Sequence, residues 1–194
     1  MRANAGVIGM RVTGSFGLGA VIAAGLAALV VPEAVGGAQA ADSVSGKARV
    51  LNGDTLVVGG RVVGLYGVAA PGLKQTCLDG KAQPYACGTV AAKALAAHLR
   101  DAAVTCRVRE TDGYGRAVSV CLRDKEDLSA WLAERGLVMA DRRRGQAAYV
   151  GAETLAWGKR LGLWAGSFED PTNRPRTTYH HANAVADANK PEAR

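Results

Sequence analysis

The chain has 194 residues, 24 Lys and Arg against 17 Asp and Glu, and a formal net charge of +7. Once an N-terminal targeting segment is set aside, this length leaves room for one domain with a substantial core and excludes two domains of ordinary size. The basic balance suits a polyanionic ligand or an anionic envelope surface, although charge alone does not separate such a role from an aid to solubility.

The N-terminal segment has the layout of a secretory signal. Arg2 and Arg11 precede an apolar run over 16–31, and a small-x-small tripeptide ends at Ala40. The alternative is a membrane anchor, but a helical run of this length reaches only ~24 Å across a hydrocarbon core about 30 Å thick. We therefore expect a signal peptide over 1–40, export to the periplasm or the medium, and no stable membrane anchor after processing.

Short strands rich in β-branched residues come next. Segments 47–51, 55–58 and 61–66 predict a meander, with Gly59-Gly60 as the two-residue connection of its second hairpin. That turn places position 64 opposite Thr55. A helix is expected over 88–100, with one apolar face made by Val90, Ala91, Ala94, Leu95 and Leu99. Strands at 104–109 and 117–122 complete an order of three strands, a helix and two strands, which is typical of a five-stranded OB-type barrel.

Two more helices follow the barrel. Asp127 is placed to cap a helix over 128–135 that Gly136 ends, and a third helix is expected over about 147–160. The inward positions are expected to be Leu128, Trp131 and Leu132 in one helix and Tyr149, Ala152, Leu155 and Ala156 in the other. Met139, Leu163 and Trp164 are interpreted as core or edge packing. The fold class is thus α+β, mainly β, with about three helices, a domain over 41–166 and a disordered tail over 167–194.

Four cysteines fall in the exported part, where two disulfides are the default. They are Cys77, Cys87, Cys106 and Cys121. If 112–115 is the tight turn of a hairpin, Cys106 lies opposite Cys121 at a distance that a disulfide can bridge, and Cys77 pairs with Cys87.

This register places apolar and charged side chains on the same face of the hairpin. It puts Val118 and Val120 on the side of Arg107 and Arg109, which a bulge near Gly115 would repair by shifting the register one residue. The pairing of Cys106 with Cys121 therefore stays open at this point.

Three motifs now stand in order along the chain: Asn-Gly-Asp-Thr at 52–55, RVVGLYGVAAPG at 61–72, and Asp-Gly-Tyr-Gly-Arg at 112–116. Together they resemble the staphylococcal-nuclease (thermonuclease) family over about 46–164. The resemblance implies an OB-fold barrel and metal-assisted hydrolysis of phosphodiesters in DNA or RNA.

Part of the implied active site is missing. The family pattern has an arginine where Gly64 stands, an aspartate where Ala69 stands and a glutamate where Gly72 stands. Only Arg116, as the catalytic match, and Asp54, as the metal match, are retained. Calcium prefers six to eight oxygen ligands, so we expect no cofactor or weakly bound calcium. Losing a transition-state donor costs roughly 10²- to 10³-fold in rate, and losing a general base or acid roughly 10²- to 10⁴-fold. The sequence therefore predicts weak or absent hydrolysis.

Three hypotheses remain. The favoured one is a degenerate nuclease that binds single-stranded nucleic acid or another polyanion, with Arg107, Arg109 and Tyr114 as the binding residues. The second is an active periplasmic or secreted calcium-dependent nuclease with a rearranged site, to which Lys74 or Asp79 would contribute. The third is a structural or protein-interaction barrel, in which Asp54 only forms a turn and Arg116 only pairs with Asp112. A further basic run, 142–144, is interpreted as a solvated face or a phosphate contact.

Overall fold

The computed structural model describes residues 42–143 and 147–173. The expected signal peptide, Arg144 of the basic run and the chain from residue 174 onward lie outside these ranges. Among the described residues, none belongs to a helix with the length and apolar character needed to cross a bilayer.

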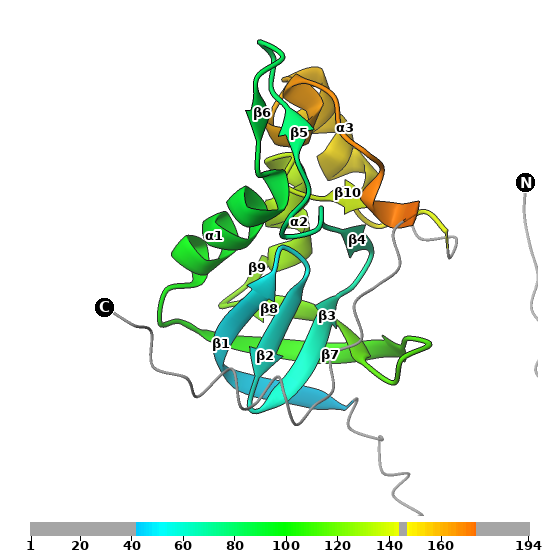
Figure 1. Ribbon diagram of the computed structural model, residues 1–194. Helices are drawn as coiled ribbons and strands as arrows, with labels where there is room; N and C mark the ends of the chain where they lie inside the picture. Colours follow the sequence, from blue (N-terminus) through cyan, green and yellow to red (C-terminus); the bar gives the residue numbers. More distant parts are fainter. Residues whose placement is uncertain (1–41, 144–146, 174–194) are drawn as a thin grey trace, which may run out of the picture. The chain divides into compact units, whose positions relative to one another are not determined.

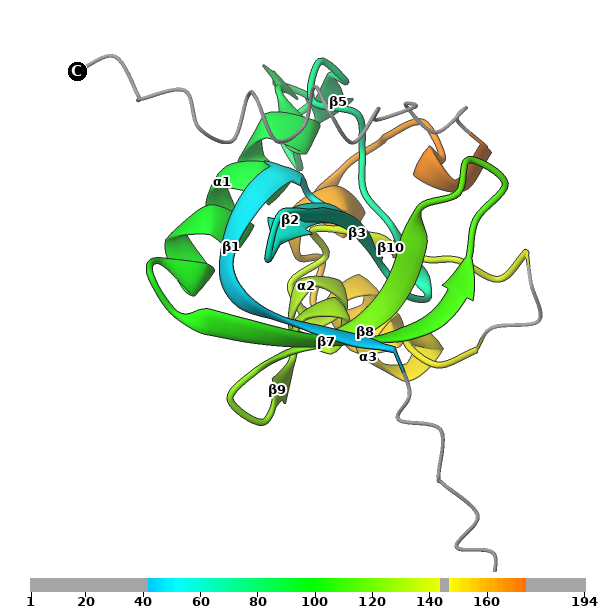
Figure 2. The same cartoon turned by 90° about the horizontal axis from the view of Figure 1, so that it is seen from below.

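Five strands form a closed barrel, as the sequence predicts. They are β1 (Ser43–Asn52), β2 (Thr55–Val58), β3 (Arg61–Leu65), β7 (Ala103–Thr111) and β8 (Ala117–Arg123). The order β3-β2-β1-β7-β8 is antiparallel throughout, and a parallel pairing of β3 with β8 closes the ring (Figure 2). This is the OB-type order of strands. The two-residue β9 (Glu126–Asp127) extends the sheet beside β8.

The β2–β3 hairpin has the predicted register. Gly59 and Gly60 both have positive φ, at 55° and 77°, which is the backbone that a tight two-residue hairpin favours. Thr55 consequently lies opposite Gly64. Every second residue of these strands is directed into a core that is closed to water. The buried strand residues of this core are Leu56, Val58, Val63, Leu65, Val104, Cys106 and Cys121.

The β7–β8 hairpin confirms the disulfide and corrects the position of the bulge. Cys106 lies opposite Cys121 and is bonded to it. The register shifts between Val108 and Glu110, so the bulge lies at Arg109 on β7 and not near Gly115. Because this extra residue changes the pairing only at the turn end of the hairpin, Val118 is buried there while the Cys106–Cys121 register is kept.

Three α-helices accompany the barrel: α1 (Cys87–Leu99), α2 (Leu128–Glu134) and α3 (Val150–Gly158). Figure 1 shows α1 beside the end of the barrel that carries the β1–β2 turn, and α2 packs against both β8 and α3. Two 3-10 turns, η1 (Gly162–Ala165) and η2 (Pro171–Asn173), follow α3. Short strands that the sequence did not predict connect these parts: β4 (Val68–Ala69) pairs with β10 (Met139–Ala140), and β5 (Cys77–Leu78) pairs with β6 (Pro84–Tyr85).

The helix caps follow the sequence, but two of the expected core positions are wrong. Asp127 accepts hydrogen bonds from the backbone N–H groups of Ser129 and Ala130, as an N-cap does. Val90 and Leu155 are exposed rather than buried, Leu155 to 56 %. In α3 the buried face is made by Ala156 and the carboxylate-bearing Glu153, so Leu155, one residue before Ala156, is turned to solvent.

The C-terminal end of the domain also differs from the expected boundary at residue 166. Ser167 accepts a hydrogen bond from the backbone N–H of Leu78, and Pro171 and Thr172 are buried. The Glu169 carbonyl also accepts from the Gln75 amide, so contacts with the β5–β6 arm and the adjoining loop continue past residue 166, where the domain was expected to end.

Candidate active site

The β1–β2 turn presents Asp54, and both of its carboxylate oxygens have donors. Thr55 Oγ1 donates to Oδ1 at 2.8 Å, and the backbone N–H of Ala70 donates to Oδ2 at 2.9 Å. The close approach depends on Gly53, since a Cβ there would lie 2.8 Å from the Cβ of Ala70 and 2.9 Å from that of Ala91. Asp54 therefore fastens the turn to the segment that follows β4.

The retained arginine, Arg116, folds inward from the start of β8. Its Nε donates to Asp112 Oδ2 at 3.0 Å and its Nη1 donates to Thr55 Oγ1 at 2.8 Å. The side chain is only 10 % exposed. Thr55 accepts from Arg116 and donates to Asp54, so a continuous chain of hydrogen bonds joins Asp112, Arg116, Thr55 and Asp54. The structure thus brings the two retained family residues together through a threonine.

One nitrogen of Arg116 remains without a partner. Nη2 is buried and donates to no acceptor among the described residues. It lies over Gly64, where a Cβ would come within 2.9 Å of the Arg116 Cζ atom and 3.0 Å of Nη2. The absence of a side chain at position 64 thus provides the space that the Arg116 guanidinium occupies.

Asp112 is the group that holds Arg116, and the sequence assigned it only a possible pairing role. Burial by itself would raise the pKa of Asp112, but hydrogen bonds from the backbone N–H groups of Arg116 and Tyr114 and the charge of the Arg116 guanidinium lower that pKa below its usual value. Asp112 is therefore an ionised and almost fully enclosed carboxylate, with its side chain 3 % exposed.

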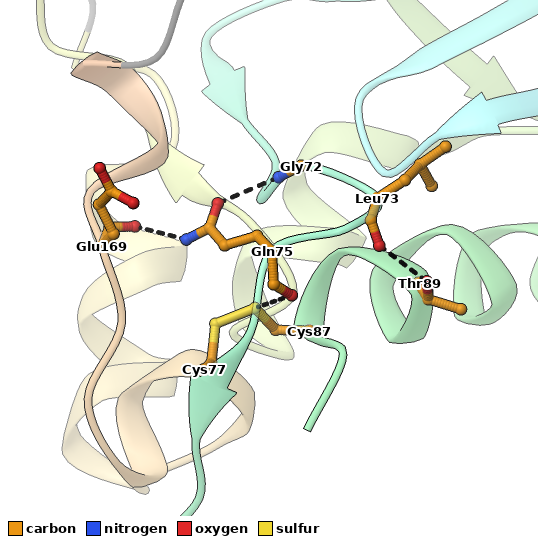
Figure 3. Close-up of a disulfide and its surroundings, with 7 residues drawn as sticks. All are labelled: Gly72, Leu73, Gln75, Cys77, Cys87, Thr89 and Glu169. Atoms are coloured by element: carbon orange, nitrogen blue, oxygen red, sulfur yellow. Dashed lines mark hydrogen bonds between the residues drawn. A yellow bond between two sulfur atoms is a disulfide. The ribbon is translucent and has the colours of Figure 1, made fainter. Parts of the chain in front are cut away.

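The other two family positions carry no functional group. Ala69 is buried and pairs with Met139 across β4 and β10. The backbone of Gly72 is enclosed by Gln75, whose Oε1 accepts from the Gly72 N–H at 3.1 Å and whose own N–H donates to the Gly72 carbonyl at 2.8 Å (Figure 3). Gly88 packs directly on this carbonyl, since a Cβ there would lie 1.8 Å from the Gly72 oxygen.

A disulfide fixes this loop against the first turn of α1. Cys77 is bonded to Cys87, as predicted, with 5.7 Å between the two Cα atoms. Figure 3 shows the loop beside it, where Thr89 Oγ1 donates to the Leu73 carbonyl and the Gln75 amide donates to the Glu169 carbonyl. The loop that carries Gly72 is thus held on both sides by backbone contacts.

The side chains that were weighed as substitutes are placed elsewhere. Asp79 accepts from the backbone N–H groups of Lys81 and Gln83 within the β5–β6 turn, and Lys74 is exposed. In the described ranges, no three or more His, Cys, Asp and Glu side chains are grouped as metal ligands. Two carboxylates lie beside Arg116, those of Asp54 and the enclosed Asp112, and both oxygens of each already accept hydrogen bonds.

The predicted binding residues form a separate surface. Arg107 and Arg109 are exposed on β7 and line a hollow of about 190 Å³ together with Val108 and Val120. Neither arginine forms an ion pair with another described residue. Tyr114 is exposed at the hairpin tip. The structure therefore does not bring these residues into the hydrogen-bonded chain around Arg116.

Comparison with known proteins agrees with this architecture. The family model described as staphylococcal nuclease homologue matches residues 62–166. The succinoglycan biosynthesis protein ExoI of Rhizobium meliloti (strain 1021) is 37 % identical over 145 residues, which are 74 % of this chain and 74 % of that protein. Members of this family have a nuclease-like domain and bind nucleic acid. The chain belongs to the family of staphylococcal nuclease homologues.

Proposed function

We propose that this protein is an exported, non-hydrolysing nuclease homologue that binds single-stranded nucleic acid through the exposed arginines of β7. The observation that carries the proposal is the contrast between two sets of cations. Arg116, the one retained family arginine, is enclosed and bonded to Asp112 and Thr55. Arg107 and Arg109 are exposed and free of ion pairs to described residues.

Hydrolysis is not supported by the groups present. Phosphodiester cleavage needs positive charge on the developing phosphorane oxygens and a prepared water. Arg116 has one unpartnered nitrogen, enclosed over Gly64, and would have to leave Asp112 to reach a phosphate. Calcium prefers six to eight oxygen ligands but would find the Asp54 carboxylate alone, because that of Asp112 is enclosed and bonded to Arg116. The residues present do not fit a calcium site, and we propose that the domain works without one.

Binding is supported by the spacing and exposure of the β7 cations. Arg107 and Arg109 are two residues apart on β7, so they share one strand face, and both border the same hollow. Each phosphate contact on a single strand contributes about 0.7 to the slope of log affinity against log salt concentration. Two arginine contacts therefore account for a slope of about 1.4. Tyr114, at the exposed tip of the same hairpin, offers a face on which a base stacks.

The test is the salt dependence of binding to an oligothymidylate, measured by fluorescence anisotropy. The double variant Arg107→Gln with Arg109→Gln is expected to bind more weakly and to lower the salt slope by about 1.4. Lys93→Gln, which removes one exposed charge from α1, serves as the control and should leave the slope near its native value. An unchanged slope in the double variant would refute the β7 site.

An acidic polysaccharide is the second candidate ligand. It is favoured by the relative from Rhizobium meliloti, which is named for succinoglycan biosynthesis. The same arginines would bind its carboxylates, so competition between oligothymidylate and sodium alginate measures which polyanion the surface prefers. Stronger binding of alginate than of the oligonucleotide at equal charge concentration would reverse the order of the two candidates.

Export is supported by both disulfides, which form and persist in oxidising compartments. The measurement is the N-terminal sequence and intact mass of protein recovered from the periplasm or the medium of the cells that express the full chain. We expect an N-terminus at Ala41 and a mass reduced by that of four hydrogen atoms for the two bonds. Protein that keeps its first 40 residues and stays with the membrane would contradict the proposal.

A further inference from the structure

A second surface of the domain carries two tryptophans between two adjoining hollows. One hollow, of about 380 Å³, is lined by Arg142, Glu153, Thr154, Trp157 and Trp164. The other, of about 260 Å³, is lined by Trp157, Gly158, Arg160 and Trp164. Both indoles border both hollows, so they stand at the centre of one continuous surface on α3 and η1. None of these residues belongs to the hydrogen-bonded chain around Arg116 or to the β7 surface.

The two indoles differ in how firmly the fold holds them. Trp157 is 64 % exposed on α3. Trp164 is half-buried, and the ring of Phe168 meets it edge-on at 5.2 Å between centroids. The backbone N–H of Trp164 also donates to the Leu161 carbonyl at 3.0 Å, and its indole N–H is buried without a partner among the described residues. One ring therefore forms a fixed wall, and the other stands beside it with its face open to solvent.

Polar groups are arranged around these rings. Glu153 is buried below the surface, where its Oε1 accepts from the backbone N–H of Ala140 at 2.9 Å and its Oε2 accepts from the Arg142 guanidinium. Half of the Arg142 side chain is exposed, and the guanidinium has five N–H donors. Thr154 uses its hydroxyl hydrogen on the Val150 carbonyl, which leaves the oxygen able to accept.

The charge of this surface selects among ligands. Arg142 is neutralised by Glu153, so Arg160 is the lining cation that has no ion pair among the described residues. A strand of phosphates needs several unpaired cations in a row and would meet the Glu153 carboxylate here. A protein partner would need a broader apolar patch than two indoles with charged groups around them. A saccharide matches both features, since pyranose rings lay their C–H faces on indoles while their hydroxyls bond to planar polar groups.

We propose that the Trp157–Trp164 surface binds an uncharged segment of a polysaccharide chain. A pyranose ring stacks on the open face of Trp157, beside the fixed wall of Trp164. Its hydroxyls accept from Arg142 at one end and from Arg160 at the other, and one donates to the Thr154 oxygen. This site is independent of the proposed nucleic-acid surface on β7, and the two ligands do not compete.

The test is affinity electrophoresis of the folded protein in native gels that contain hydroxyethylcellulose, galactomannan or no polysaccharide. Retardation by at least one of the two polysaccharides is expected. Trp157→Ala should weaken the retardation at least tenfold on the scale of polysaccharide concentration. Leu155→Ala is the matched control, because Leu155 is 56 % exposed on the same helix and borders neither hollow. Trp157→Phe should retain part of the binding, because it keeps an aromatic face.

Both variants change exposed side chains, so their unfolding free energies should stay within about 0.5 kcal/mol of the native value. Equal loss in the Leu155 and Trp157 variants, or absence of retardation in both gels, would overturn the saccharide site. It would also be overturned if Trp157→Ala weakened oligothymidylate binding instead, which would assign the surface to nucleic acid. An unchanged salt slope in the Arg107→Gln and Arg109→Gln double variant, with retardation intact, would refute the function proposed above and leave the saccharide site standing.

Discussion

Replacing Arg116 by methionine should destabilise the domain strongly, because this arginine holds a buried carboxylate. The substitution keeps a long apolar stem over Gly64 and removes the guanidinium. Asp112, with its side chain 3 % exposed, then loses the Nε donor to Oδ2, and Thr55 loses the donor to its hydroxyl. The carboxylate keeps the two backbone N–H donors to Oδ1.

The magnitude follows from this partial loss. Removing one partner of a buried ion pair costs roughly 3–5 kcal/mol. Because the backbone donors to Asp112 remain, we expect the lower end, about 3 kcal/mol. With a urea slope near 2 kcal/mol/M, the unfolding midpoint should fall by about 1.5 M. Adding Asp112→Asn removes the buried charge, so the double variant should be more stable than the sum of the two single losses by at least about 1 kcal/mol.

Urea titration followed by far-ultraviolet circular dichroism, with both disulfides intact, gives these free energies. A loss of less than about 1 kcal/mol in Arg116→Met would contradict the structural role of this arginine. Additive effects of Arg116→Met and Asp112→Asn would contradict it too, since they would mean that the two side chains do not stabilise one another. A structural role predicts coupling, whereas a purely catalytic arginine predicts a stable variant.

Three further outcomes follow from the same contacts. Gly64→Ala should destabilise the domain by about 1–3 kcal/mol, because the new Cβ would lie 2.9 Å from the Arg116 Cζ. Gly113→Ala is the control: its Cβ meets open space, so thermal melts should show a change of less than about 0.5 kcal/mol in the free energy of unfolding. The pKa of Asp112 is lower in the folded than in the unfolded protein, so its ionised form stabilises the folded state. This contribution is fully present above the unfolded pKa of about 3.9 and is lost as the pH falls through the folded pKa. In acid titrations, the difference in stability between the native protein and Asp112→Asn should therefore close below pH ~4. Asp127→Ala removes the acceptor of two helix N–H groups and of a tyrosine hydroxyl, so a urea titration should show a loss of about 2 kcal/mol; a loss below about 0.5 kcal/mol would contradict this capping role.

The barrel could be predicted because its signals are local. Gly59-Gly60 fixes one hairpin, and the opposition of Cys106 and Cys121 fixes the other. The bulge was misplaced because a residue such as Arg109 looks like any other exposed strand position, and only the pairing and burial of Val118 reveal the shift.

The enclosure of Arg116 over Gly64 could not be predicted from the sequence. Motif comparison identified Arg116 and Asp54 as retained, but it compares positions one at a time. The structure shows that the missing side chain at Gly64 and the inward fold of Arg116 depend on one another across two strands. Such a pair is visible only once the β3–β8 pairing brings the strands together.

The aromatic surface was missed for a related reason. Trp164 was interpreted as packing, which its contact with Phe168 supports, and Trp157 gave no signal within a helix expected to bury Leu155. The helix begins at Val150, and its inward positions are Glu153 and Ala156. A buried carboxylate on the apolar side of the helix breaks the hydrophobic periodicity on which the prediction depended.

We propose that the enclosed Arg116 and the hydrogen-bonded Asp54 leave the domain unable to cleave phosphodiesters. A decisive experiment incubates the purified, disulfide-intact protein in excess over a labelled single-stranded oligonucleotide, with calcium and with chelator, and resolves the products by denaturing electrophoresis. We expect an intact oligonucleotide in both mixtures. Cleavage that requires calcium, stops on chelation and disappears in an Arg116→Lys variant of native stability would contradict it.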